Sequence, residues 1–117
     1  MGVTRNNIAR LNRDGTLDAA FNANASFDVF TIAVQADGRI VVVGFFTSFS
    51  GVSVPNMLRL LPDGSIDPDF DLTAGPNNIT SCVRLHEDGR MIIAGSFSSV
   101  DGTPRAGLAR LHSDGSL

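Results

Sequence analysis

The sequence predicts an all-β protein built from repeated four-stranded antiparallel units of about 50 residues. Three observations support this prediction. The pair Asp-Gly recurs in three copies of one phrase, at Asp14, Asp63 and Asp114, which lie 49 and 51 residues apart. A second phrase, at residues 32–51, recurs 51 positions later at residues 83–102. The acids are nearly all Asp, which favours turns, and no window keeps a helical period.

Each period contains two Asp-Gly pairs between strand-like runs. Asp-Gly is the strongest short signal for a β-hairpin, because glycine supplies the positive φ that a tight turn needs. In the complete middle unit we therefore expect four strands, at residues 28–35, 39–46, 56–61 and 65–70. Gly44 and its equivalent Gly95 interrupt apolar strands, which indicates a bulge or a close approach of another backbone.

The phase of the repeat divides the chain into three parts. Residues 1–25 are expected to hold the second half of a preceding unit, with its third and fourth strands at residues 6–21. Residues 26–75 form a complete unit, and residues 76–117 form a unit truncated in its last strand. A sheet with two apolar faces must stack on copies of itself, as the blades of a β-propeller or as an open β-repeat array.

The number of units is too small for a closed ring, which usually has at least four blades. We therefore expect either a segment of a longer array or a subunit that copies of itself complete. Both alternatives leave unpaired strand edges, which act as templates for association. The isolated chain is expected to oligomerise or to be poorly soluble.

The residues also carry a resemblance to a known family. The stretches "IARLNRDGTLDAAF", "IAVQADGRIVVVGFFTSFSG" and "VRLHEDGRMIIAGSFSSVDGTPRAGLARLHSDGSL" are similar to the delta-60 repeat, a bacterial β-propeller-like family, over residues 6–117. The chain departs from that pattern at Val43, where glycine is usual, and in the weaker copy "NMLRLLPDG". The resemblance implies large bacterial surface or secreted proteins, or phage fibres, and hence an extracellular or cell-surface location. It implies no established activity and no functional residues.

Composition argues against several function classes. The net charge is −3 and the nine basic residues, all Arg, are scattered singly, which does not fit a nucleic-acid binder. The longest apolar run, at residues 40–46, is too short to span a membrane, and the first residues lack the pattern of a signal peptide. Cys82 is the single cysteine and is expected to be a small core residue rather than a reactive thiol.

No catalytic, cofactor-binding or metal-binding residue is predicted, and we expect that the protein is not an enzyme. His86 and His112 fall at different phases of the repeat, and no G-x-S-x-G motif is present, so both histidines are expected at the surface. Two oxygen-rich turns resemble Ca²⁺ sites, but they lack the spaced acids and the closing Glu of a true Ca²⁺ loop, and we interpret them as hairpin turns. Their residues are Asn12, Asp14 and Asp18 in one turn, and Asp63, Asp67 and Asp69 in the other.

The repeated arginines Arg10, Arg59 and Arg110 allow two interpretations. They either line a shared anion-binding surface or, as we expect, pack their stems between units and pair with a turn Asp. The whole pattern favours a non-catalytic structural or interaction module, whose partners are other protein chains or copies of itself. The alternative is a ligand-binding module that holds a glycan or a peptide in the loops at residues 22–28 and 71–78. The lack of Trp and Tyr weighs against a glycan.

Overall fold

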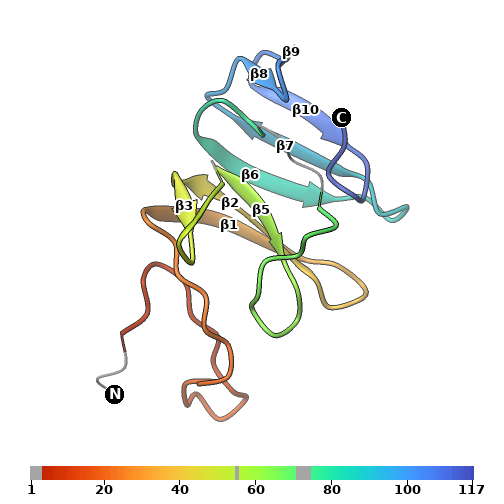
Figure 1. The fold of residues 1–117 in the computed structure, drawn as a ribbon. Helices are drawn as coiled ribbons and strands as arrows, with labels where there is room; N and C mark the ends of the chain where they lie inside the picture. Colours follow the sequence, from red (N-terminus) through yellow and green to blue (C-terminus); the bar gives the residue numbers. More distant parts are fainter. Residues whose placement is uncertain (1–3, 55, 71–74) are drawn as a thin grey trace.

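The computed structural model describes residues 4–54, 56–70 and 75–117, and these residues form strands and turns with no helix among them (Figure 1). The predicted all-β fold is therefore confirmed. The described strands are β1 Asp28–Val34, β2 Ile40–Phe45, β3 Ser48–Phe49, β4 Val52–Ser53, β5 Met57–Leu60, β6 Thr80–Leu85, β7 Met91–Gly95, β8 Ser99–Val100, β9 Thr103–Pro104 and β10 Leu108–Leu111. Since no described segment is helical, none is a helix able to cross a membrane.

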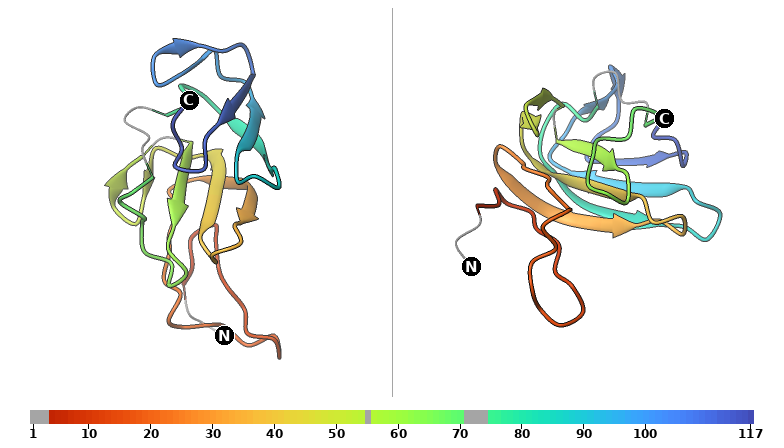
Figure 2. Two further views of the ribbon diagram at one scale, coloured as in Figure 1. Left: turned by 90° about the vertical axis from the view of Figure 1, so that its right-hand side faces the viewer. Right: turned by 60° about the horizontal axis from the view of Figure 1, so that its bottom comes forward.

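Two three-stranded antiparallel sheets repeat one another along the chain. The first has the strand order β1-β2-β5, and the second has the corresponding order β6-β7-β10. The strands predicted at residues 28–35, 39–46 and 56–61 are confirmed to within one residue at each end. The sheets are neighbours in space in an open arrangement, as the views in Figure 2 show.

The fourth strand of the middle unit is shorter than the sequence predicts. Residues 65–70 contribute a single bridge, from Ile66 to β5, and a hydrogen bond of 2.9 Å from the Asp67 N–H to the Arg59 carbonyl. Pro68 then ends the pairing, because proline has no N–H to donate. The chain therefore leaves the sheet early, and the fourth position is held by the bridge alone.

The N-terminal segment also pairs less than predicted. Residues 6–21 were expected to form two strands, but here a single bridge joins Leu11 to Leu17. Among the described residues, this segment has no neighbour in the position that β2 has in the next unit. A two-stranded hairpin without such a neighbour is marginal in water, which explains the missing ladder.

The Asp-Gly turns have the conformation that the sequence predicts. Gly64 has φ +93°, and Gly15 and Gly115 have nearly the same value. Asp63 fixes its turn through Oδ1, which accepts hydrogen bonds from the Ser65 N–H at 2.9 Å and from the Ser65 hydroxyl at 2.6 Å. The side chains of the turn acids thus accept hydrogen bonds within their own turns, as the hairpin interpretation predicts.

Gly44 is required by a close approach of two strands, as predicted. A Cβ added at this position would overlap the carbonyl oxygen of Asp28 and lie 2.9 Å from the Cα of Val29. The register of β1 against β2 shifts at this place, between Val29 and Thr31. Gly95 meets β6 and the residue before it in the same manner, so both alternatives in the prediction, the bulge and the close approach, occur together.

Two short hairpins were not predicted. The pairs β3–β4 and β8–β9 each comprise two residues per strand, around turns at Gly51 and Gly102. They hold the loop before each sheet: Ala25 bridges to β3, and Asn77 Oδ1 accepts hydrogen bonds from the backbone at the start of β8. Strands this short leave no periodic pattern in a sequence, although the two glycines at equivalent positions marked the turns.

The described residues form two apolar cores. One lies between the two sheets, and the other lies between the first sheet and the N-terminal segment. Thr31 also donates a hydrogen bond of 2.9 Å from Oγ1 to the Ser81 carbonyl across the sheets. The core between the sheets comprises Val41, Val43, Met57, Val83, Met91, Ile93, Phe97, Val100, Ala109 and Leu111. The second comprises Phe21, Ala23, Ala25, Ile40, Val42, Phe46, Phe49, Leu58 and Leu60.

Candidate functional site

The repeated arginine of β5 joins two consecutive units. Arg59 is 4% exposed, and its Nε donates to Asp67 Oδ2 at 2.8 Å. Its Nη1 donates to the carbonyl of Ser113, in the turn of the following unit, at 2.6 Å. The guanidinium also lies over the ring of Phe70, 4.8 Å from the centroid, where the cation meets the negative face of the ring. We call this set, Arg59, Asp67, Phe70 and the Ser113 carbonyl, the Arg59 clamp.

The preceding unit repeats the same arrangement with Arg10. Arg10 Nε donates to Asp18 Oδ2 at 2.9 Å, and its guanidinium lies 4.5 Å from the centroid of the Phe21 ring. Its Nη1 donates to the carbonyl of Pro62, in the turn of the middle unit. In both units the acid follows the arginine by eight positions and the phenylalanine follows it by eleven. We call this second set the Arg10 clamp.

Each clamp phenylalanine covers the glycine of the next turn. The Phe21 ring lies against Gly64, where an added Cβ would meet it at 3.0 Å, and the Phe70 ring lies against Gly115 at 2.9 Å. Gly64 and Gly115 are buried, whereas Gly15, in the first copy of the phrase, has nothing within 4 Å of its Cβ position. Each of these two Asp-Gly turns thus closes its own hairpin and also packs against the phenylalanine of the preceding unit.

The carboxylate of the Arg59 clamp pairs with two arginines, one inside the clamp and one beside it. The carboxylate of Asp67 is 1% exposed and lies between Arg59 and Arg39, whose Nε is 3.3 Å from Oδ2. Burial alone would raise the pKa of this carboxyl, but the Asp69 N–H and the Arg59 guanidinium outweigh burial and hold the pKa below its ordinary value. Asp67 is therefore ionised at neutral pH and is a structural ion rather than a proton donor.

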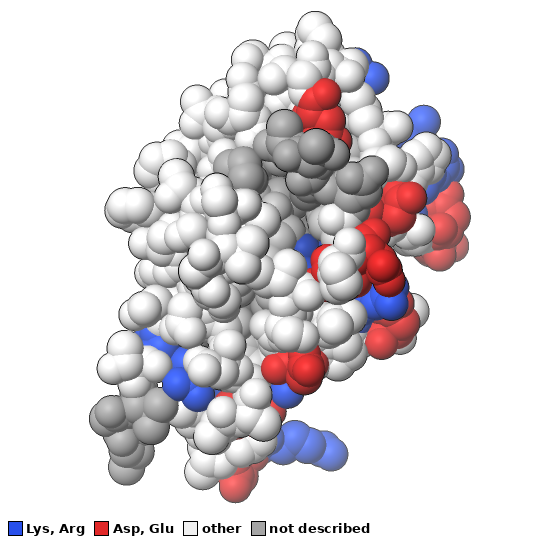
Figure 3. Space-filling view, in the orientation of Figure 1, with Lys and Arg blue, Asp and Glu red and all other residues white. Residues whose placement is uncertain are grey.

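The acids of the Asp-Gly turns have lowered pKa values for a different reason. At Asp63 the main cause is the hydrogen bond from the Ser65 hydroxyl, and at Asp114 it is the bond from Ser116. Figure 3 shows charged side chains gathered along the side of the molecule where these turns lie, while most of the opposite side is uncharged. A pocket of about 390 Å³ opens there, between the turns of the two units, and Arg39, Arg59 and Asp114 contribute to its wall.

Two of the three repeated arginines occupy the positions that the sequence predicts for them. Arg10 and Arg59 pair with acids as expected, although the partner is the Asp four residues after the turn acid rather than the turn acid itself. Because Asp18 and Asp67 pair with these arginines, each candidate Ca²⁺ set loses one acid. The described residues contain no group of three acidic, His or Cys side chains that could hold a metal. Arg110 is exposed and makes none of the clamp contacts within the described part of the chain.

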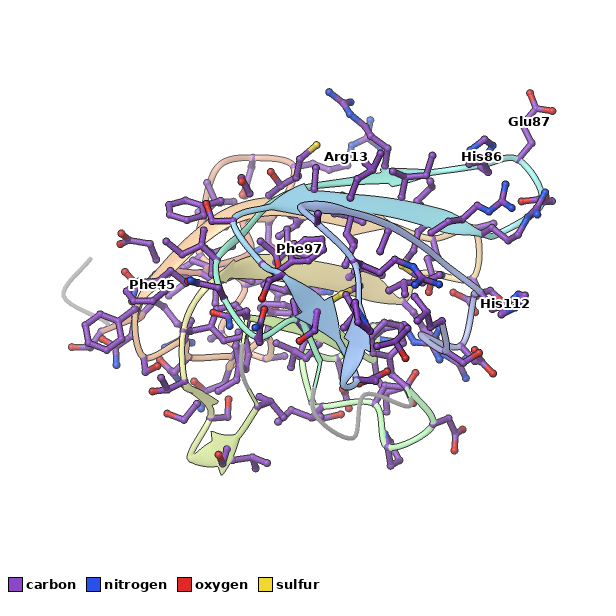
Figure 4. All side chains as sticks on the ribbon, turned by 90° about the horizontal axis from the view of Figure 1, so that it is seen from above. Arg13, Phe45, His86, Glu87, Phe97 and His112 are labelled. Carbon is purple, nitrogen blue, oxygen red and sulfur yellow. The ribbon has the colours of Figure 1, made fainter. Side chains whose placement is uncertain are left out.

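His86, His112 and Cys82 have separate positions. Both histidines are exposed, and Figure 4 shows them with Glu87 at the turn end of the molecule, opposite Phe45. The surface position predicted for them is confirmed. Cys82 is half-buried rather than in the core, because it lies on the outer face of β6, which the first sheet does not cover.

The loops considered for ligand binding are tied to the fold where the structure describes them. In the loop at residues 22–28, Asn24 accepts a hydrogen bond from the Asn6 N–H, and Ser26 donates to the Ser48 carbonyl at 3.1 Å. In the loop at residues 71–78, positions 71–74 lie outside the described residues, and Gly75 donates to Asp101 Oδ1 at 2.8 Å. The described residues of these loops therefore brace the short hairpins.

Repeated antiparallel sheets that pack face to face define a repeat protein of the β-propeller type. Comparison with family models agrees: the model described as a domain of unknown function (DUF5122) beta-propeller matches residues 1–21, 35–70 and 86–117. The match covers well over half of the chain, and the chain belongs to this family. The matched segments hold both clamps and the Asp-Gly turns, and they leave out the loops. No curated protein and no solved structure gave a match.

Proposed function

We propose that this chain is a non-catalytic structural and interaction module of the delta-60 type, which acts by binding further β-sheet units through its two outer faces. In this proposal it serves a larger bacterial surface, secreted or phage assembly. The turn acids and clamp arginines are engaged in holding the fold, which leaves the apolar faces as the surfaces that offer binding energy.

The observation that carries the proposal is a difference in burial between equivalent residues. Met57 is 1% exposed where the first sheet meets the second, but its equivalent Leu108 is 61% exposed on the outer side of the second sheet. Val83 is 2% exposed in the same interface, and its equivalent Ile32 on the outer side of the first sheet is 49% exposed. The same sequence positions are thus used for packing inside the chain and presented to solvent at its two ends.

The two outer faces lie at opposite ends of the stack of sheets. The C-terminal face comprises Ile92, Ala94, Leu108 and Arg110, and a hollow of about 440 Å³ lies over it. The N-terminal face comprises Phe30, Ile32 and Val34, all of them exposed on β1. These faces, rather than the strand edges alone, are the surfaces that we propose for partners.

Sedimentation velocity over a wide range of concentrations tests this proposal. We expect the wild type to associate, and we expect one charge on either face, in Ile32→Asp or Leu108→Asp, to weaken association without loss of the β-sheet circular dichroism. Arg13→Asp, in an exposed turn, is the matched control and should associate like the wild type.

A glycan array separates this proposal from the ligand-binding alternative. Reproducible binding of a sugar, abolished by substitutions in the loop at residues 22–28, would favour a lectin. A chain that stays monomeric at every concentration and binds sugars would overturn the proposed function.

A further inference from the structure

Two exposed phenylalanines pack against each other at the end of the first sheet that lies opposite the Asp-Gly turns. Phe27 is 55% exposed and Phe45 is 43% exposed, and their ring centroids are 6.0 Å apart, with the ring planes inclined by 36°. Figure 4 shows Phe45 at the end of the molecule opposite His86 and His112. Large apolar side chains on a protein surface are usually scattered singly, so a contacting pair of exposed rings is a feature to explain.

A carboxylate without a partner stands beside this pair. Asp28 follows Phe27 in the chain and lies directly opposite Phe45 in the ladder of β1 and β2. Directly opposite residues of antiparallel strands project from the same face of a sheet, with Cβ atoms about 5 Å apart. Asp28 is exposed, and its side chain makes no ion pair or hydrogen bond with any residue that the structure describes. We call Phe27, Asp28 and Phe45 the aromatic site.

The repeat does not require these three residues. The equivalent positions in the next unit, 51 residues later, hold Asn78, Ile79 and Ser96, and that unit builds the same three-stranded sheet. By contrast, the glycine that precedes the second phenylalanine is present in both units, because the fold needs a residue without a Cβ there. The middle unit therefore carries at this place a set of side chains that the packing of the sheet does not explain.

The neighbouring units inside the chain leave this place open on both sides. The second sheet follows the first and packs on it, yet Phe27 and Phe45 remain exposed beside it. The first sheet precedes the second, yet Asn78 and Ser96, at the equivalent positions, are exposed as well. The aromatic site thus lies at the rim of the stack, outside the contact between one unit and the next.

The chain itself shows which cation such a set of residues holds. In both clamps a guanidinium lies over a phenylalanine ring, 4.5 or 4.8 Å from the centroid, while its Nε donates to a carboxylate. The aromatic site presents the same two groups, ring and carboxylate, and no described arginine lies over its rings. Lysine is a less suitable partner, because its compact and strongly hydrated ammonium has no planar surface to stack on a ring.

We propose that the aromatic site binds an arginine side chain of a partner protein. In this arrangement the guanidinium lies against the exposed rings of Phe27 and Phe45 and donates a pair of hydrogen bonds to the Asp28 carboxylate, which suits its planar fork. The negative charge of Asp28 and the negative faces of the rings are complementary to this cation. The inference goes beyond the proposed function, because it assigns a partner to a surface outside the two outer faces.

Titration with N-acetyl-arginine amide, followed through the NMR signals of the phenylalanine rings at low protein concentration, tests the site. N-acetyl-citrulline amide, which has nearly the same shape but no charge, is the matched control ligand. We expect arginine amide to shift the signals of Phe27 and Phe45, and citrulline amide to bind about threefold more weakly or less, since it lacks the cation.

Two variants locate the binding. Asp28→Asn removes the charge, and Phe45→Ser introduces the residue with which the next unit builds its sheet. We expect each to weaken the binding of arginine amide by about threefold or more, with circular dichroism as the check on folding. Leu108→Asp, on the C-terminal face, is the matched control and should bind arginine amide like the wild type. Conversely, Asp28→Asn should self-associate like the wild type in sedimentation velocity.

Several outcomes would overturn this inference and leave the proposed function in place. They are the absence of any shift with arginine amide, equal binding of citrulline amide, and unchanged binding in Asp28→Asn. Tighter binding of choline than of arginine amide would assign the site to a free quaternary ammonium ligand instead of a protein. Reproducible binding of a sugar that Phe45→Ser abolishes would assign it to a glycan. The proposed function is tested separately, by the self-association of Leu108→Asp.

Discussion

Replacing Arg59 by Met separates the charge of the clamp arginine from the packing of its stem. Methionine fills much of the same apolar space, so the change removes chiefly the guanidinium. The loss leaves the Asp67 carboxylate, 1% exposed, with Arg39 at 3.3 Å and the Asp69 N–H at 2.9 Å. It also removes the 2.6 Å hydrogen bond to the Ser113 carbonyl of the next unit.

The expected cost follows from this geometry. Removing one partner of a buried ion pair typically destabilises a protein by about 3–5 kcal/mol, because the other charge is left uncompensated. Arg39 still neutralises part of the Asp67 charge, so the lower end of the range applies, and we expect about 3 kcal/mol. In a domain of this size that corresponds to a fall of roughly 12 °C in the melting temperature.

Urea unfolding followed by far-UV circular dichroism measures this loss, since the chain has no Trp or Tyr to report by fluorescence. Arg10→Met is the matched control: the side chain of Arg10 is 39% exposed, so water can replace its contacts and the loss should be much smaller. Equal losses at the two positions, or a loss below about 1 kcal/mol at Arg59, would refute the argument from buried charge.

The pH dependence provides a second readout of the same substitution. In the wild type the pKa of Asp67 lies below the ordinary 3.8, so its contribution to stability is complete above pH 3.8 and is lost as the pH falls through the folded-state pKa. Without Arg59 the burial of Asp67 is less opposed, so its pKa rises and this loss in acid becomes smaller. The free energies of unfolding of the wild type and of Arg59→Met, measured between neutral pH and about pH 2, should therefore converge in acid. A constant difference between them at every pH would contradict the assignment of Asp67 as the charged partner of Arg59.

Three further predictions concern packing and metal binding. Gly44→Ala should destabilise the fold by about 1–3 kcal/mol in thermal unfolding, because the new methyl group overlaps the Asp28 carbonyl; an unchanged melting temperature would show that β1 can shift. Phe21→Ala should cost about 3–5 kcal/mol through loss of the cover over Gly64, whereas the exposed Phe30→Ala should cost about 0.5 kcal/mol or less. Calcium should leave the melting temperature equal to that in EDTA; a clear rise would restore the Ca²⁺ interpretation of the turns.

Much of the fold could be predicted because the strands and turns recur at fixed positions of the sequence repeat. The strand at residues 39–46 and the close approach at Gly44 follow from residues that must be apolar or lack a Cβ. The length of the fourth strand is overestimated from the sequence. The strand-like pattern extends over residues 65–70, but pairing with β5 ends at Asp67 and Pro68. Local propensity cannot show that the side chain of Asp67 is paired with Arg59.

The clamp could be predicted only in part. The recurrence of Arg59 and of Asp67 in the sequence indicates a pair, but the third partner is a backbone carbonyl, at Ser113, which any residue can supply. The opposite burial of Met57 and Leu108 was equally hidden, since equivalent positions have similar side chains and differ only in what lies against them. Sequence defines which surface is apolar, and tertiary structure decides whether it is covered.

The outer faces of the two sheets are equivalent in sequence position to the surfaces that meet inside the chain, and we expect them to bind in the same way. Methyl NMR spectra recorded at increasing protein concentration test it directly. We expect the signals of Ile32, Ile92 and Leu108 to shift together as the chain associates, while those of the buried Leu60 and Leu111 stay in place. Association that leaves the methyl groups of both faces unchanged would contradict it.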